Sequence, residues 1–367
     1  MTSPRTAHGE DLLARLVAFA RAERARIAPT GAGVHLAKDY HTGLGHIEQF
    51  RRGVLPRLRR CGDLSGCRVL EVGAGAGYIA TMLAATEVGY VVASDSDWAR
   101  FSPHSPFLTE AFQSIAREWK SDRGTGILPV NEVVSFDSGR PEFNDKRLTF
   151  IQADGSCLPF PDGVFDAVIA HSCLEHFPDL EGVFGEMLRV LRSGGLLYAE
   201  SEKFWGARDG SHLYEIFPAP WIHLLAAADV LWRFYEADYG GKDILWPGRF
   251  VDREYFIGVL QRDLNRRGVR AIKKMLLQSG CDLVFWQQLS RPEDRILLRQ
   301  LGLRRALRDW PLEELLTSYL AFGLRKRPPR LVTHLILRFP WVLKQAVPES
   351  LKRVLRDQFQ KVNRQPP

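Results

Sequence analysis

The residues with the clearest chemical potential form a glycine-rich stretch from Val69 to Ala80. Strand-like alternation around Glu71 ends in three glycines, Gly73, Gly75 and Gly77, and an apolar helical pattern follows. Glycine tolerates a positive φ and lets a ligand approach the backbone closely. The free N–H groups at the start of a helix then face that ligand. We therefore expect a nucleotide-type binding loop at the carboxyl end of the first strand of an open α/β sheet.

This loop is compatible with two kinds of nucleotide cofactor. A dinucleotide pattern, G-x-G-x-x-A, runs from Gly75 to Ala80, and Asp95 follows at the spacing of a ribose-binding acid. Two features argue against a dinucleotide. Glu71 lies inside the strand, and the chain already turns at Gly73, before the dinucleotide pattern begins at Gly75. The series Glu71-x-Gly73-x-Gly75-x-Gly77 resembles the first motif of class I S-adenosylmethionine (SAM) dependent methyltransferases. The loop alone leaves both NAD and SAM open.

Further along the chain, a series of ordered motifs extends the resemblance. They are a strand ending in Asp154, then Leu158-Pro-Phe160, Phe165-Asp166, Leu174-Glu175-His176, Arg189-Val-Leu191 and Gly194-Gly195. This order is similar to that of the large methyltransferase group that contains the ubiquinone-type enzymes. Several matches in order are much harder to obtain by chance than one glycine loop, so SAM is the cofactor we expect.

The fold that the resemblance implies is α/β, a Rossmann-like seven-stranded sheet whose last strand is antiparallel, with helical insertions and a basic C-terminal helical tail. We expect an N-terminal helix and cofactor-covering segment at 1–54 and the methyltransferase domain at 55–328. Insertions are expected at 98–147, 201–250 and 291–316, and the tail at 329–367. Within these parts, residues 137–146 look like loop, 221–236 like a helix, and 318–328 like the seventh strand.

The resemblance also implies a set of cofactor residues. Asp95 would accept hydrogen bonds from the ribose hydroxyls, Asp154 from the adenine amino group, and His171 would lie under the transferable methyl group. The N-terminal segment with Tyr40, His41 and His46 could fold over the cofactor, but ordinary capping and helix-surface roles are the favoured interpretation of these three residues. The full cofactor set is Glu71, Gly73, Ala74, Gly75, Gly77, Asp95, Ser96, Asp154, Gly155 and His171.

The segment after Glu200 must pass over the open end of the sheet, and it mixes aromatic with polar side chains. We assign Tyr214, Glu215 and Trp221 to the substrate; a lid packed only for stability is the alternative. An alcohol acceptor needs a base at its hydroxyl. His212 is the preferred base and His176 the second, with a structural role open for each. We find no metal-ligand spacing and expect no metal.

Composition bounds the remaining possibilities. With 45% apolar and 25% charged residues the chain is typical of a globular protein with a sizeable core. Its five cysteines lack paired spacing, which indicates reduced thiols and a cytoplasmic location. The N-terminus has no long apolar run that would predict a signal peptide or a membrane span.

The net charge of +7 is concentrated in the tail, because residues 321–367 contain eleven basic residues and only two acidic ones. An apolar stripe backed by lysine and arginine after Pro348 predicts contact with an anionic membrane surface, as a peripheral protein on the inner face of the membrane. Docking on protein is the alternative. Nucleic acid is an unlikely partner, because no repeated aromatic-plus-basic pattern runs through the catalytic part.

The sequence thus predicts a SAM-dependent methyltransferase that O-methylates a saccharide or lipid-linked glycan. The alternatives are methylation of a small molecule or quinone-like lipid, and a SAM-fold binding module without turnover. An oxidoreductase receives no support from the motifs after the loop.

Overall fold

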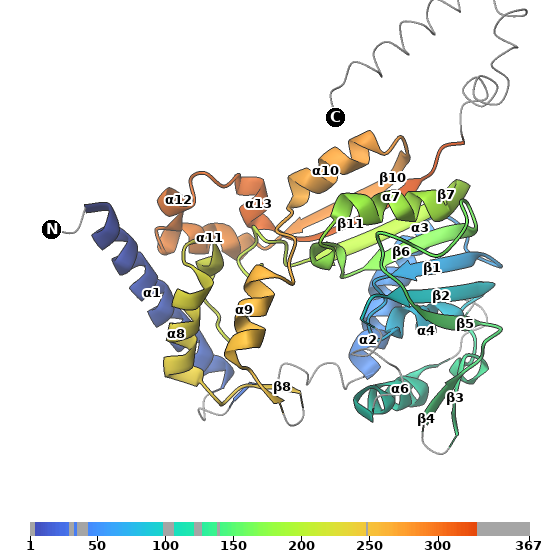
Figure 1. Cartoon of the computed structure of the whole chain (residues 1–367), viewed down its shortest axis with the longest axis horizontal. Helices are drawn as coiled ribbons and strands as arrows, with labels where there is room; N and C mark the ends of the chain where they lie inside the picture. The colour runs from blue at the N-terminus through green and yellow to red at the C-terminus, as the bar shows by residue number, and fades with distance from the viewer. Residues whose placement is uncertain are drawn as a thin grey trace, which may run out of the picture. The chain divides into compact units, whose positions relative to one another are not determined.

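A seven-stranded sheet organises the molecule (Figure 1). The computed structural model describes residues 4–28, 33–34, 43–97, 106–120, 127–137, 140–246 and 249–328. The strand order is β10-β11-β7-β6-β1-β2-β5. In chain order the strands are β1 (Arg68–Val72), β2 (Tyr90–Asp95), β5 (Leu148–Gln152), β6 (Phe165–His171), β7 (Leu191–Glu202), β10 (Asp282–Ser290) and β11 (Thr317–Arg325).

The strand directions confirm the predicted methyltransferase-type sheet. Strands β5, β2, β1, β6 and β7 pair in parallel. Strand β11 pairs antiparallel with both β7 and β10, so the last strand enters between two earlier ones. The carboxyl ends of the parallel strands therefore meet at one edge, where sheets of this kind bind ligands.

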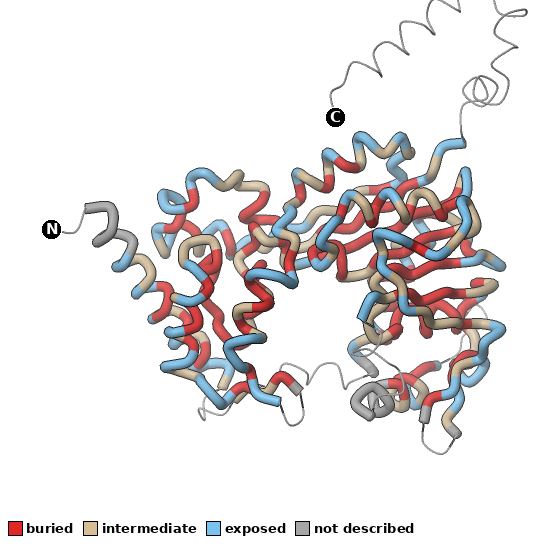
Figure 2. Tube along the Cα trace, viewed as in Figure 1, coloured by how far each residue is buried: buried red, intermediate tan, exposed pale blue. Residues whose placement is uncertain are grey.

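Helices cover both faces of the sheet, and the strand residues alternate between the two resulting cores. Val69, Ile169 and Tyr198 pack with α2 (Gly43–Gln49), η2 (Phe50–Val54), α3 (Leu55–Cys61) and α4 (Tyr78–Ala84). Leu70, Val168 and Leu197 pack instead with α7 (Leu180–Val190) and α10 (Val269–Gln278). Figure 2 shows the strands buried through the centre of this part. Burial on both faces explains their nearly continuous apolar sequences.

The insertion at 98–147 contains a hairpin that the sequence does not predict, beside a helix at 106–118 that it does. It contains α6 (Pro106–Glu118), η4 (Val130–Glu132) and a hairpin of β3 (Val134–Asp137) and β4 (Arg140–Phe143). The prediction of loop at 137–146 is therefore wrong for the hairpin residues. The hairpin forms because Phe143 packs edge-on against Phe112 of α6, with ring centroids 5.4 Å apart, which anchors two short strands that lack their own periodicity.

Several helices enclose a second core. They are α1 (Pro4–Ile27), α8 (Ala228–Tyr239), α9 (Arg253–Gln261), α11 (Pro292–Gln300), α12 (Leu303–Ala306) and α13 (Leu312–Leu316), and a small hairpin of β8 (Ile244–Trp246) and β9 (Arg249–Phe250) adjoins them. Large side chains such as Trp221, Tyr235 and Phe256 fill this core. The helix predicted at 221–236 is displaced: Trp221 has a φ of 56°, which a right-handed helix cannot include, so only the short η6 (Ile222–Leu224) follows before α8 begins.

A buried ion pair attaches α1 to this core. The Arg24 guanidinium pairs with Asp243, and both side chains are at least 95% buried. Asp243 also accepts hydrogen bonds from the Tyr235 hydroxyl at 2.9 Å and from the Val34 backbone N–H at 2.7 Å. The N-terminal helix is thus held by polar contacts as well as by Leu16, Val17 and Ala20.

Some predictions fall on residues that the structure leaves undescribed. Tyr40, His41 and the tail from 329 onward lie outside the described residues. The described residues up to Lys326 belong to one compact unit, Met1–Lys326, and the predicted boundaries at 54 and 328 stay predictions. Among the helices that the structure describes, none is long and apolar enough to cross a membrane.

Candidate functional site

The glycine loop joins β1 to α4 in the way that the sequence predicts. Gly73, Gly75 and Gly77 all have left-handed backbones, with φ of 70°, 51° and 77°. The Gly75 N–H donates to Asp95 Oδ2 at 2.8 Å, and the Asp97 N–H donates to Asp95 Oδ1 at 2.9 Å. Asp95, at the end of β2, therefore holds the loop and places its carboxylate beside it.

The three glycines serve different steric purposes. A Cβ on Gly73 would lie 2.9 Å from Cys173 Sγ, and one on Gly77 would lie 2.2 Å from Phe150 Cε1. A Cβ on Gly75 would meet nothing within 4 Å. Gly73 and Gly77 thus let the loop pack closely, whereas the surface at Gly75 is open to a ligand.

Glu71 lies beneath this loop, and its carboxyl group is incompletely hydrogen-bonded. Its side chain is buried, and its Oε2 has no hydrogen-bond partner. Burial raises the pKa of Glu71 to about 7, although the neighbouring His171 partly offsets the shift. Such an oxygen can accept a hydrogen bond from a donor group of a bound ligand.

A buried polar network at the ends of β6 and β7 adjoins Glu71. Its centre is Glu200, whose Oε1 lies 3.0 Å from His171 Nε2. Glu200 Oε2 accepts from the Tyr319 hydroxyl at 2.7 Å, from Arg57 Nη1 at 3.1 Å and from the Tyr198 hydroxyl. Although burial opposes ionisation, His171 and the two tyrosines lower the pKa of Glu200 to about 2. The carboxylate is therefore charged, and His171 is held against it.

Three more predicted cofactor positions follow β5 and β2. Asp154 is exposed, and its Oδ1 accepts from the Ser156 N–H and hydroxyl, both at 2.8 Å; these bonds lower its pKa. Gly155 is packed against Val183 and Val72, where a Cβ would approach to 3.1 Å. The Ser96 carbonyl accepts from Gln152 at 3.0 Å. These positions share the sheet edge that carries Asp95.

The fold brings the two predicted catalytic histidines together. The His176 and His212 rings meet edge to face with centroids 5.0 Å apart. Glu175 Oε1 lies 3.9 Å from His176 Nε2 and 4.0 Å from His212 Nε2. Burial, His176 and Lys203 lower the pKa of His212 well below its usual value, whereas burial raises the pKa of Glu175. We call Glu175, His176 and His212 the Glu–His–His cluster.

Neighbouring groups fix each member of this cluster. The Ser201 hydroxyl donates to Glu175 Oε2, and His176 Nδ1 lies 3.0 Å from the Asp263 carbonyl oxygen. Asn265 donates to the carbonyl oxygens of Leu174 and Phe177 at 2.7 and 2.8 Å, which secures the turn that carries Glu175 and His176.

Backbone strain is concentrated around the cluster. Ser172, Lys203 and His212 have φ of 50°, 54° and 56°, a conformation that side chains other than glycine rarely adopt. Strain of this kind costs of order 1–3 kcal/mol per residue and is typical of sites whose geometry serves function. The cluster is therefore a candidate active site.

The predicted substrate residues have mixed surroundings. Glu215 pairs with Lys203, and Tyr214 lies under the Arg208 guanidinium at 5.5 Å; both are half-buried. Trp221 has no exposed surface, and its indole N–H donates to the carbonyls of Gly206 and Leu315. Trp221 therefore packs in the second core and offers no surface to a ligand. This agrees with the alternative interpretation, in which the segment after Glu200 is a lid packed only for stability.

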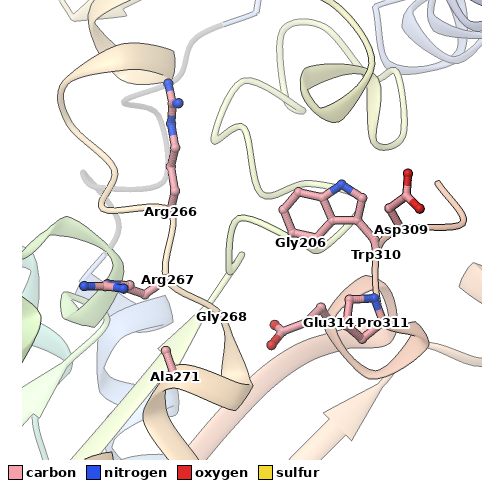
Figure 3. Close-up of a pocket in the computed structure, with 9 residues that line it drawn as sticks. All are labelled: Gly206, Arg266, Arg267, Gly268, Ala271, Asp309, Trp310, Pro311 and Glu314. Carbon is pink, nitrogen blue, oxygen red and sulfur yellow. The ribbon is translucent and has the colours of Figure 1, made fainter. Parts of the chain in front are cut away.

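A cavity of about 400 Å³ lies beside this segment (Figure 3). Arg266 and Arg267 stand on one side, and Trp310 with Asp309 on the other. Arg267 pairs with Glu181 at 3.2 Å, and the Arg266 guanidinium covers the Trp205 ring. The charged groups of this cavity already have protein partners, so we assign no chemistry to it.

Comparison with known proteins decides the family of the sheet and its motifs. Residues 111–199 match the family described as "Methyltransferase domain". This stretch belongs to a methyltransferase domain. The match supports SAM as the cofactor that the sequence motifs predict. The match runs from α6 into β7, so it includes most of the insertion and leaves out β1, the glycine loop and β2; the loop geometry above describes that part of the domain.

The curated relatives match over short stretches. A sterol 24-C-methyltransferase of Gibberella zeae is 50% identical over 50 residues, which is 14% of this chain and 13% of that protein. A demethylmenaquinone methyltransferase of Thermus thermophilus is 38% identical over 91 residues, covering 20% and 41%. A ubiquinone/menaquinone C-methyltransferase of Francisella tularensis is 26% identical over 174 residues, covering 46% and 61%. The chain thus spans less than two thirds of each.

Among solved structures, a putative methyltransferase of Haloferax volcanii in complex with the Trm112 activator is similar to this chain. The two are 15% identical with a TM-score of 0.41, over 78% of this chain and 94% of the other.

The residues of the site fit SAM. The open surface at Gly75 leaves room for the molecule. Its ammonium, ribose and adenine groups are hydrogen-bond donors, and acceptors for them are present in the partnerless Oε2 of Glu71 and the carboxylates of Asp95 and Asp154. His46 of α2 stacks against Tyr78 of α4, with centroids 4.4 Å apart, which brings the N-terminal segment to the helix after the loop.

Sequence reasoning missed Arg57, Tyr319 and Asn265. Their contacts reach across more than 85 positions and follow no local pattern. Glu200 was detectable, because an acid near the carboxyl end of β7 must lie beside His171, which ends the parallel neighbour β6.

Proposed function

We propose that the protein transfers the methyl group of SAM to a small-molecule acceptor that is activated at the Glu–His–His cluster. SAM supplies an electrophilic methyl group on a sulfonium. The observation that carries the proposal is the position of the cluster: Glu175 and His176 follow β6 shortly after His171, and the Ser201 hydroxyl of β7 donates to Glu175. The cofactor loop and the cluster therefore belong to the same edge of the sheet.

The chain's own residues would do three things in this reaction. The loop with Asp95 and Asp154 would bind the nucleoside, and correct placement of methyl group and acceptor is worth several kcal/mol in an in-line transfer. Glu200 and Glu71 would hold His171 beneath the reacting region. His212, whose imidazole is neutral, would accept the acceptor's proton, with His176 as the second candidate.

For the acceptor we propose a sterol- or quinone-like lipid. Support comes from the relatives, which include sterol 24-C-methyltransferases and demethylmenaquinone methyltransferases, although only over short stretches. A saccharide or lipid-linked glycan is the second candidate, and the observation in its favour is the half-buried pair of Tyr214 and Glu215 close to His212 in the chain. Contact of the basic tail with an anionic membrane stays part of the proposal, since a lipid acceptor would be presented at such a surface.

The test is transfer of isotopically labelled methyl groups from SAM to a panel of sterols, demethylated quinones and saccharides. We expect label in one acceptor class, and a loss on the order of 100-fold or more in kcat for His212→Asn. His223→Gln is the matched control, since His223 belongs to the same segment but contacts the Trp205 carbonyl instead of the cluster. Label in no class would contradict the proposal.

A further inference from the structure

We propose that Glu175, His176 and His212 together hold one divalent transition-metal ion. This inference rests on the proposed function, because the ion would bind the oxygen of the acceptor at the same place. The sequence predicts no metal, since Glu175-His176 and His212 lie far apart in the chain and only folding brings them together.

The donor atoms are close enough for this role. The three ligand atoms lie within 4.8 Å of one another. Ligands of a tetrahedral ion with bonds of about 2.0–2.1 Å lie roughly 3.3 Å apart, so the observed 3.9 and 4.0 Å between Glu175 and the histidines need a contraction of under an ångström. Because every pair of ligand atoms lies within 4.8 Å, no pair needs to close by more than about 1.5 Å.

Two of the three ligands also have the outer partners that metal sites use. A ligating histidine normally donates its second N–H to a carbonyl or carboxylate, which fixes the tautomer. His176 Nδ1 meets the Asp263 carbonyl in this way and leaves Nε2 for the ion. Ser201 binds Glu175 Oε2 and leaves Oε1 facing both histidines.

His212 requires a local change on loading. Its Nε2 lies 3.2 Å from the Lys203 carbonyl oxygen, to which it donates in the metal-free form. Binding an ion through Nε2 moves the proton to Nδ1 and breaks that hydrogen bond. Lys203 and His212 already have strained left-handed backbones in the metal-free form. The segment therefore presents His212 beside Glu175 and His176 before any ion binds.

The ligand set indicates the class of metal. Two imidazoles and one carboxylate suit Zn²⁺, Fe²⁺ and related ions better than Mg²⁺ or Ca²⁺, which prefer oxygen ligands. Three protein ligands leave at least one position open. An acceptor oxygen bound there would be oriented and made more acidic. In the metal-loaded protein His212 would bind the ion instead of acting as the base, and the proton of the acceptor would pass to water.

The experiment is titration of the chelator-treated full chain with Zn²⁺, followed by calorimetry and by elemental analysis after desalting. We expect one equivalent, and at least tenfold weaker binding in Glu175→Gln and His176→Asn. His223→Gln should keep the full equivalent. No bound zinc, or equal binding by every variant, would overturn the inference.

A second variant separates ligation from folding. His176→Cys keeps a metal ligand but replaces nitrogen by sulfur, so its Co²⁺ complex should gain a sulfur-to-cobalt charge-transfer band that the parent lacks. A variant that binds cobalt without this band would overturn the assignment of His176.

The inference and the proposed function fail differently. Undiminished methyl transfer by the metal-free protein overturns the metal site and leaves the methyltransferase. Zinc binding at the cluster supports the metal site even in a protein that transfers no methyl group, whereas that lack of transfer overturns only the function.

Discussion

Glu200 is the side chain on which the polar contacts beside the cofactor loop converge. It joins His171 of β6, Arg57 of α3 and two tyrosines from β7 and β11. A charged carboxylate with this many donors stabilises the folded state, because the unfolded chain offers none of them.

Replacing Glu200 should make stability less dependent on pH. Its pKa is about 2 in the folded protein and near the usual 4.5 in the unfolded chain, so its contribution is complete above pH 4.5 and disappears as the pH falls through 2. Glu200→Gln should lower the free energy of unfolding by on the order of 3 kcal/mol at pH 7 and by roughly half as much at pH 3. Denaturant titration at both pH values measures this; an equal loss at both would contradict the assigned pKa.

The turn from β1 into α4 depends on backbone freedom as well as on space. Gly77 has a left-handed backbone and also touches the Phe150 ring, whereas Gly302 has a similar φ of 65° and open space around it. The two positions therefore separate strain from crowding.

Gly77→Ala should destabilise the protein more than Gly302→Ala. Strain alone costs about 1–2 kcal/mol at either site, and the clash with Phe150 adds to it only at Gly77. Thermal denaturation measures the difference, and Gly77→Ala should also weaken binding of S-adenosylhomocysteine at least tenfold. Equal destabilisation with unchanged binding would show that the loop has room that the structure does not give it.

The attachment of α1 provides a comparison between a buried and an exposed ion pair. Arg24→Ala removes the ion-pair partner of the buried Asp243, which should cost about 3–5 kcal/mol of unfolding free energy. Arg21→Ala removes the pair with Asp238 near the surface and should cost at most about 1 kcal/mol. Denaturant titration of the two variants tests this, and equal losses would argue against a buried Arg24.

How far the sequence predicts this molecule depends on the range of the interactions. The strand that holds Glu71 and the glycine turn follow from local patterns, and the antiparallel last strand follows from the family resemblance; the structure confirms all three. Local patterns failed for the hairpin at 134–143, which forms only against α6, and for the start of α8, which Trp221 delays.

The candidate site was predictable in part for the same reason. His176 and His212 were singled out separately, but their meeting depends on how the segment after β7 folds back. Two ion pairs fasten that segment to its neighbours, Arg208 with Asp294 and Arg291 with Asp209, each at 2.8 Å. No periodicity encodes such pairs, so the approach of the two rings to 5.0 Å had to come from the structure.

At the scale of the whole molecule, the glycine loop and Asp95 must bind SAM for the protein to act as a methyltransferase. Calorimetric titration with S-adenosylhomocysteine, alongside NADH, for the wild-type protein and Asp95→Ala measures this directly. We predict micromolar binding of S-adenosylhomocysteine that weakens at least tenfold in the variant, and no binding of NADH. Binding of NADH alone, or of neither ligand, would contradict it.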